Sequence, residues 1–202
     1  LGTMDALASD DTITATSMSL PSTLAVGGLI NGGTGVDTLK LAAGTTLNLD
    51  NLTRNQTVQH IQQGEVFQLQ GSSSLTLTAN DVLSLGGSNA TTMQPYTFTA
   101  TSGGSGSASS TGKVQFVVNG TSTDALVLDT LQQDGVTTNG VVGNTGLAGQ
   151  WDYMGTAIVN SVTYKVYNHS TTKAQVLTQM DATVRSNAIA FSSMTKDSGP
   201  SG

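Results

Sequence analysis

A single glycine-rich nonapeptide at residues 32–40, GGTGVDTLK, sets the strongest limits on the structure of this chain. Its glycines permit positive φ angles and expose backbone carbonyls, and Asp37 supplies a hard anionic oxygen of the kind that calcium prefers. We therefore predict a calcium site made by the carbonyls of Gly33 and Gly35 and the carboxylate of Asp37. The alternative is a glycine turn in which the Asp37 side chain only accepts hydrogen bonds from backbone amides.

The nonapeptide occurs once, and a lone copy cannot build a stacked parallel roll in which neighbouring turns share each ion. Apolar and polar residues alternate at period two after it, as in Leu39, Leu41, Leu47 and Leu49, which predicts strands. We expect an all-β fold, a β-sandwich with calcium-binding loops and long irregular insertions. Residues 10–184 are expected to form one domain, residues 1–9 a linker or expression remnant, and residues 185–202 a tail.

The amino-acid composition makes several classes of function improbable. Charged residues make up 10% of the 202 residues, well below the roughly 25% of an average protein, and the formal net charge is −6 with seven Lys and Arg. Binding to nucleic acid or insertion into a membrane is therefore not expected. Cysteine is absent, which excludes disulfides and thiolate zinc sites. No stretch has the length of a membrane helix or the pattern of a signal peptide.

Nearly all acidic residues are Asp, which favours turns and calcium loops, whereas Glu65 is the only Glu. Each Asp taken singly is expected to be a turn or capping residue, but together they predict at least one further calcium site. The candidate ligands beyond the nonapeptide are Asp50, Asp81, Asp124, Asp129 and Asp134, and the adjacent pair Asp10 and Asp11 is a further candidate.

Two stretches interrupt the strand pattern, the Gly-, Ser- and Thr-rich residues 86–112 and the Gly- and Asn-rich loop at residues 134–149. Long insertions on a rigid scaffold often carry binding sites. The aromatic residues Tyr96, Trp151 and Tyr153 are candidates for lining a ligand pocket. The alternative for Trp151, the only Trp, is a buried core residue.

Local signals predict a helical turn at residues 80–83 capped by Asn80, and hairpin turns at Asn119-Gly120 and Asn160-Ser161. The two histidines occur in no catalytic motif, and His169 is expected to lie in solvent at a strand end. We therefore predict no catalytic residues and no enzymatic activity.

Several motifs in this order resemble modules near the C-terminal end of giant bacterial repeat-in-toxin adhesins. They are GGTGVDTL, LNLDNL, LTLTANDVL, then Trp151 and VTYKVY, and the resemblance covers about residues 30–184. The chain is most similar to the calcium-dependent peptide-binding domain of such adhesins. The resemblance implies a β-sandwich with several calcium ions that captures the C-terminal end of a target peptide or protein.

The same resemblance implies export by type I secretion, an extracellular location on the bacterial surface, and a role in cell adhesion and biofilm formation. It also implies a monomeric module within a longer chain. Two alternatives remain open, a structural extender module of the same kind of adhesin and a carbohydrate-binding module.

Overall fold

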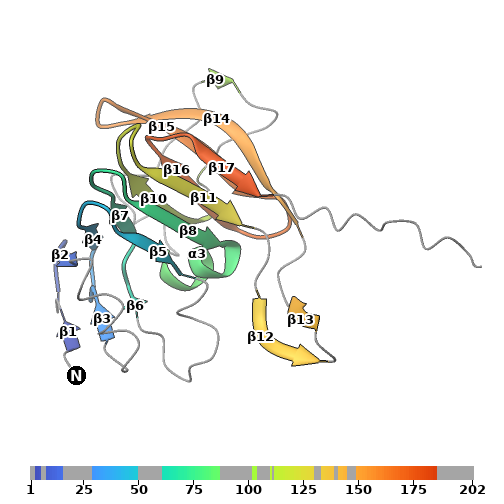
Figure 1. Cartoon of the computed structure of the whole chain (residues 1–202). Helices are drawn as coiled ribbons and strands as arrows, with labels where there is room; N and C mark the ends of the chain where they lie inside the picture. The colour runs from blue at the N-terminus through green and yellow to red at the C-terminus, as the bar shows by residue number, and fades with distance from the viewer. Residues whose placement is uncertain are drawn as a thin grey trace, which may run out of the picture.

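The computed structural model describes residues 3–5, 8–15, 29–49, 61–86, 102–103, 110, 112–129, 133–138, 141–144 and 149–185. Within these ranges the chain is almost entirely β, with one short helix (Figure 1). Most strands belong to coils, meaning successive turns of the chain that visit the same faces in the same order. A strand in one coil pairs in parallel with the strand at the same place in the next coil.

Three faces are built in this way. The first is a three-stranded sheet of β1 (Thr3–Asp5), β3 (Leu29–Asn31) and β6 (Ile61–Gln62). The second contains the parallel strands β2 (Thr12–Ala15), β4 (Thr38–Leu41), β7 (Val66–Gln68), β10 (Val114–Asn119) and β16 (Ala174–Thr178). The third is a four-stranded sheet of β5 (Thr46–Asn48), β8 (Ser74–Thr78), β11 (Ala125–Asp129) and β17 (Ala182–Arg185).

The strand register gives the length of each coil. Equivalent positions on the second face are 26 residues apart between the first two coils and 28 apart between the next two. The separation then grows to 51 residues on the third face and to 60 between β10 and β16. The later coils therefore carry the long insertions, while the paired strands keep their order.

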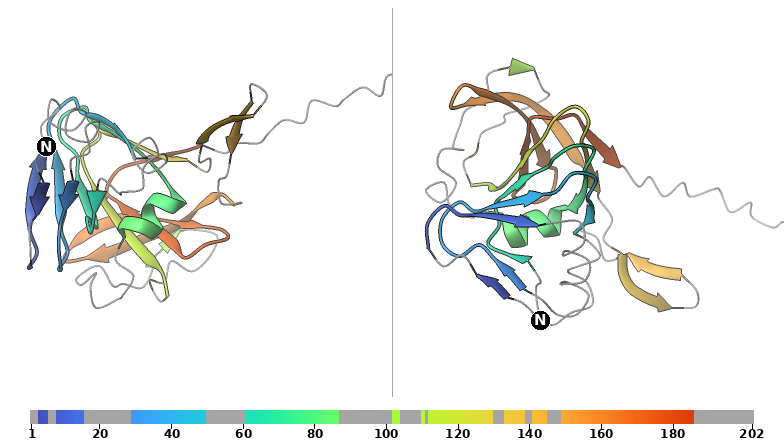
Figure 2. Two further views of the ribbon diagram at one scale, coloured as in Figure 1. Left: turned by 90° about the horizontal axis from the view of Figure 1, so that it is seen from below. Right: turned by 60° about the vertical axis from the view of Figure 1, so that its left-hand side comes forward.

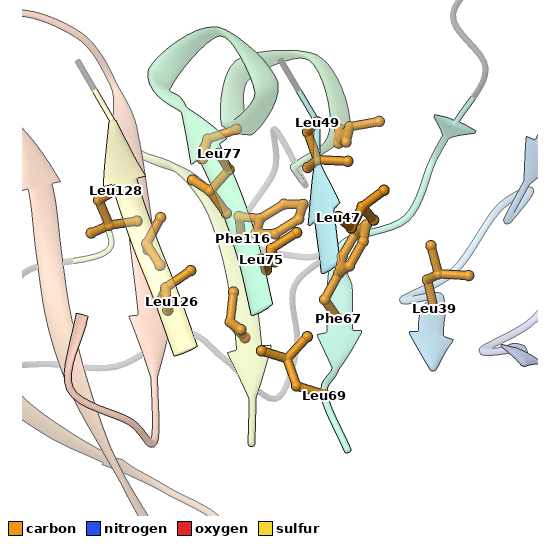
Figure 3. Close-up of a cluster of buried hydrophobic side chains, with 14 of the residues drawn as sticks. Leu39, Leu47, Leu49, Phe67, Leu69, Leu75, Leu77, Phe116, Leu126 and Leu128 are labelled. Carbon is orange, nitrogen blue, oxygen red and sulfur yellow. The ribbon is translucent and has the colours of Figure 1, made fainter. Parts of the chain in front are cut away.

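The larger core cluster lies mainly between the second and third faces (Figure 3), and a second buried cluster is built by residues such as Val117, Val166 and Leu177 of the main sheet. Period-two alternation turns one set of side chains inward from each strand, so that leucines of β8 and β11 meet aromatic residues of β7 and β10. Phe67 and Phe116 pack with ring centroids 5.1 Å apart and are fully buried. Leu75, Leu77 and Leu128 are also fully buried. This continuous apolar column is what holds successive coils together.

The second face does not remain parallel throughout. β16 pairs antiparallel with β15 (Val162–His169), which pairs antiparallel with β14 (Trp151–Val159), and β9 (Ser102–Gly103) adds to β14. The predicted turn at Asn160-Ser161 is confirmed, because both residues have positive φ between β14 and β15. A separate hairpin of β12 (Gln133–Thr138) and β13 (Val141–Asn144) lies apart from the other sheets (Figures 1 and 2).

The helix α3 (Ala79–Leu85) follows β8 directly. The predicted helical turn is confirmed, but its cap is Thr78 and not Asn80. The Thr78 side chain accepts from the Asp81 amide, and the Asp81 carboxylate accepts from the Thr78 amide at 2.7 Å. This reciprocal capping box satisfies two amides at the helix N-terminus.

The prediction of an all-β fold is confirmed in part, because the described chain is mostly β with one short helix, and the described strands do not form a clear β-sandwich. The main sheet is mixed and largely parallel. The hairpin predicted at Asn119-Gly120 is wrong, because β10 and β11 belong to different sheets and the turn between them is a corner of a coil. Residues 134–149, expected as a loop, contain most of the hairpin of β12 and β13. Within the described ranges, no helix is long and apolar enough to span a bilayer.

Candidate functional site

The nonapeptide lies at the corner between the first and second faces, where an acidic residue precedes each of the first three strands of the second face. Asp11 precedes β2, Asp37 precedes β4 and Glu65 precedes β7. Because Thr12 pairs with Thr38 and Thr38 pairs with Val66, these three acidic residues occupy equivalent positions in three successive coils. We call Asp11, Asp37 and Glu65, together with the neighbouring Asp10, the acidic corner.

Hydrogen bonds connect the acidic corner from coil to coil. The Asp11 amide donates to Asp37 Oδ1 at 2.9 Å, and the Asp37 amide donates to Glu65 Oε2 at 3.0 Å. Each carboxylate thus accepts the amide of the equivalent residue in the preceding coil. The Asp10 carboxylate bonds in the opposite direction and accepts the Val36 amide at 2.9 Å.

Burial makes these carboxylates costly to ionise. Asp37 is 2% exposed and Glu65 is buried, and this desolvation raises the pKa of both groups despite the amide hydrogen bonds that lower it. The negative charges of Asp11 and Asp10 raise the pKa of Asp37 further, and those of Asp37 and Asp10 raise that of Glu65. Asp37 Oδ2 is buried and has no hydrogen-bond partner.

The absence of a side chain at Gly32 allows the Gln63 carbonyl oxygen and Asp37 Oδ2 to lie close to the Gly32 backbone. A Cβ on Gly32 would lie 1.9 Å from the Gln63 carbonyl oxygen and 2.7 Å from Asp37 Oδ2, so only glycine fits. The Gly32 amide donates to the Gln62 carbonyl at 3.0 Å, which fixes this approach. Gly32 therefore packs closely against both oxygens, and the one that is shown without a partner, Asp37 Oδ2, favours a bound proton or a cation.

The predicted calcium ligands are only partly brought together. Asp37 fits as a ligand, because its Oδ2 is buried and free. Within the described part of the chain, however, no three acidic or histidine side chains lie close enough to hold a metal ion. Asp37 Oδ1 also does what the alternative predicted, since it accepts a backbone amide. The described residues thus offer one free carboxylate oxygen rather than a complete calcium cage of six to eight oxygens.

Two further candidate ligands have structural roles. Asp81 belongs to the capping box of α3. Asp124 Oδ1 accepts the Ser73 amide and its Oδ2 accepts the Thr121 amide, both at 2.9 Å. Burial acts to raise the pKa of Asp124, but these hydrogen bonds outweigh it and lower the pKa. Both residues follow the expectation that a single Asp is a turn or capping residue.

A second hydrogen-bonded corner repeats the rule of the acidic corner. The Thr45 amide donates to Ser73 Oγ at 3.3 Å, and the Ser73 amide donates to Asp124 Oδ1. Thr45, Ser73 and Asp124 precede β5, β8 and β11 in successive coils. Asp129 lies at the end of β11, away from both corners. Asp50 and the Asp134 side chain lie outside the described residues.

The two aromatic candidates that the structure describes, Trp151 and Tyr153, differ in exposure. Trp151 is 3% exposed, donates through Nε1 to the Asp129 carbonyl at 3.1 Å, and is a core residue, as its alternative predicted. Tyr153 is 39% exposed and packs on Tyr167 with ring centroids 5.4 Å apart. Tyr96 lies outside the described residues.

His169 was expected in solvent, and that expectation is wrong. The side chain is 2% exposed and packs edge-on against Trp151, with ring centroids 5.3 Å apart. Its Nδ1 lies 3.0 Å from Thr172 Oγ1, whereas its Nε2 is buried without a partner. Burial lowers the pKa of His169, and the charge of Asp152 opposes this change. The burial of His169 depends on its cross-strand partner Trp151, which no local sequence signal identifies.

Comparisons with known proteins identify no relative. No protein-family model matches the chain, no curated protein matches it, and no solved structure matches it. The resemblance to repeat-in-toxin adhesins therefore rests on the sequence motifs alone.

Proposed function

We propose that this chain is a rigid, calcium-responsive structural module of a secreted bacterial surface adhesin. The adhesin assignment, with type I secretion and a role in biofilm formation, rests on the sequence resemblance. The structural role is supported by the stacked parallel coils, which share a large apolar cluster and have hydrogen-bonded corners. This β-solenoid-like construction suits a spacer that has to resist extension.

The observation that carries the proposal is the acidic corner. A buried carboxylate oxygen with no partner is unfavourable by roughly 1–3 kcal/mol, and a bound calcium ion would remove that cost. Asp37 Oδ2 and the Gln63 carbonyl would be ligands, and further main-chain carbonyls and water would have to complete the shell. Calcium would then hold two coils together at the point where the nonapeptide begins β4.

The test is a melting experiment with calcium and with EGTA. We expect calcium to raise the Tm of the native chain, because a ligand that binds only the folded state stabilises it. Asp37→Asn should remove most of that rise. Asp181→Asn, which neutralises an exposed Asp that lies between β16 and β17 and pairs with Lys165, is the matched control and should keep it. An equal calcium effect on both variants would show that the corner does not bind calcium.

The structural role has a separate test. Single-molecule stretching of the chain between two reference domains should show unfolding at higher force in calcium than in EGTA. The same chain should bind neither peptides nor glycans on arrays. Reproducible binding of either class of ligand would contradict a purely structural role.

Peptide binding in the same adhesin is the second candidate. The observation that favours it is the exposed Tyr153, which packs on Tyr167 in an antiparallel part of the main sheet. Peptides with free and amidated C-termini, tested with and without EGTA, distinguish the two roles. Preferential calcium-dependent binding of the free C-terminus, lost in Tyr153→Ala, would establish this candidate over the structural one.

A further inference from the structure

The two ends of the coil stack differ. At the far end, β16 is followed in the sheet by the antiparallel strands β15, β14 and β9. At the near end, β2 is the edge of the eight-stranded sheet and β1 is the edge of the three-stranded sheet. None of the described strands pairs with the outer side of β1 or β2. On the second face, therefore, only the near end presents a described edge that continues the parallel register of the coils; on the third face β17, which pairs in parallel with β11, is the edge at the far end.

The hydrogen bonds of the acidic corner have a direction. Asp37 accepts the amide of Asp11, and Glu65 accepts the amide of Asp37, so each carboxylate receives an amide from the coil before it. Asp11 occupies the same position one coil earlier. Within the described ranges, no hydrogen bond is made to its carboxylate. In the two later coils, the carboxylate at this position accepts the amide of the equivalent residue in the preceding coil. By the same pattern, the Asp11 carboxylate is an acceptor for the amide of one more coil ahead of it.

At β2, which has no described strand on its outer side, the apolar core is also only partly covered. Ile13 in β2 is equivalent to Leu39 in β4 and Phe67 in β7. Leu39 is 2% exposed and Phe67 is 0% exposed, whereas Ile13 is only partly buried against the core. Leu39 and Phe67 have a strand on each side, whereas β2 has a neighbour on one side only. An added strand would cover the remaining apolar surface of Ile13.

We propose that the edge formed by β1 and β2 is a docking surface for one more parallel coil of the same type, supplied by the same polypeptide ahead of Thr3. The coil would donate an amide to the Asp11 carboxylate and place an apolar side chain over Ile13. Its period would be close to the 26 residues that separate the first two coils. The pairing is a strand addition in which main-chain hydrogen bonds hold the coil and the corner acid fixes its register.

A second copy of the chain fits this edge less well. Head-to-tail stacking would need β2 of one copy to extend the second face of the other at its far end, where that face ends in antiparallel strands and only β17 of the third face is a parallel edge. Head-to-head pairing through a two-fold axis would make β2 antiparallel to its copy, which breaks the rule of amide to carboxylate. It would also bring Asp10 and Asp11 of two chains together, each chain carrying a net charge of −6.

The experiment extends the full chain by one designed coil. A copy of residues 29–41 followed by a copy of residues 16–28 supplies 26 residues, the period of the first coil, and is joined directly ahead of Thr3. The matched control carries the same extension with its copies of Leu39 and Leu41 changed to Asn. We expect amide exchange at residues 12–15 to slow by about tenfold in the designed chain alone, together with a Tm several degrees higher than that of the control.

Substitution of Asp11 tests the register separately. Asp11→Ala should lower the Tm of the extended chain, because it removes the predicted acceptor, and should leave the Tm of the unextended chain nearly unchanged. Asp11→Asn keeps an acceptor oxygen and should preserve the extended chain. Equal amide exchange in the designed and control chains would overturn the proposal, as would an equal effect of Asp11→Ala with and without the extension. A dimer of the unextended chain that Thr14→Pro abolishes would assign the edge to a second copy and also overturn it.

Discussion

Replacing Asp37 with Asn should make the chain more stable when calcium is absent. The structure gives the reason, since Asp37 Oδ2 is buried without a partner beside the Gln63 carbonyl. An Asn side chain keeps the oxygen that accepts the Asp11 amide and replaces Oδ2 with an NH₂ group that can donate to Gln63. Removing one unsatisfied acceptor and gaining one hydrogen bond contributes about 1–2 kcal/mol. For a chain of this size each kcal/mol raises the Tm by roughly 2–4 °C.

The pH dependence of the same substitution has a defined sign. The pKa of Asp37 is raised in the folded state, so the folded chain binds a proton more tightly than the unfolded chain does. The stability that this proton provides is fully present below the unfolded pKa, near 3.9, and is lost as the pH rises through the folded pKa. The gain from Asp37→Asn should therefore be largest at pH 7 and should shrink as the pH approaches 4.

Urea denaturation in EGTA at pH 7 and at pH 5 measures both effects through the midpoint. Asp37→Ala is the control, because it removes the acceptor for the Asp11 amide as well and should be less stable than Asp37→Asn by about 1–3 kcal/mol. The reasoning is refuted if Asp37→Asn is less stable than the native chain at pH 7 in EGTA. That result would mean that Oδ2 already has a favourable partner that Asn cannot replace.

Three further substitutions test the core, the glycine contact and the buried histidine. Phe116→Ala should lower the free energy of unfolding by about 3–5 kcal/mol, because its fully buried ring packs on Phe67; a loss below 1 kcal/mol in urea would contradict this core. Gly32→Ala should cost roughly 1–3 kcal/mol, since its Cβ would clash with main-chain oxygen. Gly64→Ala, whose Cβ meets only an ordinary contact, should be nearly neutral, and equal melting temperatures would contradict the contact. The pKa of His169 is lowered, so its stability contribution is present above the unfolded pKa near 6.5 and is lost as the pH falls through the folded pKa. Urea midpoints at pH 7.5 and 5.5 should show less acid sensitivity in His169→Gln, and unchanged sensitivity would rule out His169 as the titrating group.

The strands could be predicted from the sequence, but their partners could not. The alternation that includes Leu39 and Leu41 predicts which side chains point inward. The same alternation occurs in parallel and in antiparallel strands, so it does not predict the pairing. Glycine at a turn is equally ambiguous. Gly44 has a positive φ of 72° and Gly71 one of 44°, yet both lie at corners of coils, where the Gly44 amide donates to the Gly71 carbonyl. A hairpin at Asn160-Ser161 was predictable because a two-residue turn joins adjacent strands.

The sequence was enough to predict which residue types belong to the candidate site, but not which residues lie next to one another in it. The sequence identified Asp37 and weighed both a calcium ligand and a backbone acceptor. The amide that Asp37 accepts belongs to Asp11, which is 26 residues away, and no local signal names that partner. His169 was misplaced for the same reason, since its burial depends on Trp151 in the neighbouring strand.

A lone nonapeptide is compatible with stacked parallel coils, because successive coils do not need to repeat the nonapeptide sequence in order to stack. Each coil must supply an inward apolar residue and a corner acceptor, and the residues may differ from coil to coil. Ile13, Leu39 and Phe67 meet the first need. Asp11 and Glu65 occupy the corner position of Asp37 without repeating its glycines. These three coils share an acidic residue directly before a short apolar alternation, at separations of 26 and 28 residues. This looser pattern identifies all three coils, whereas the complete nonapeptide identifies only one of them.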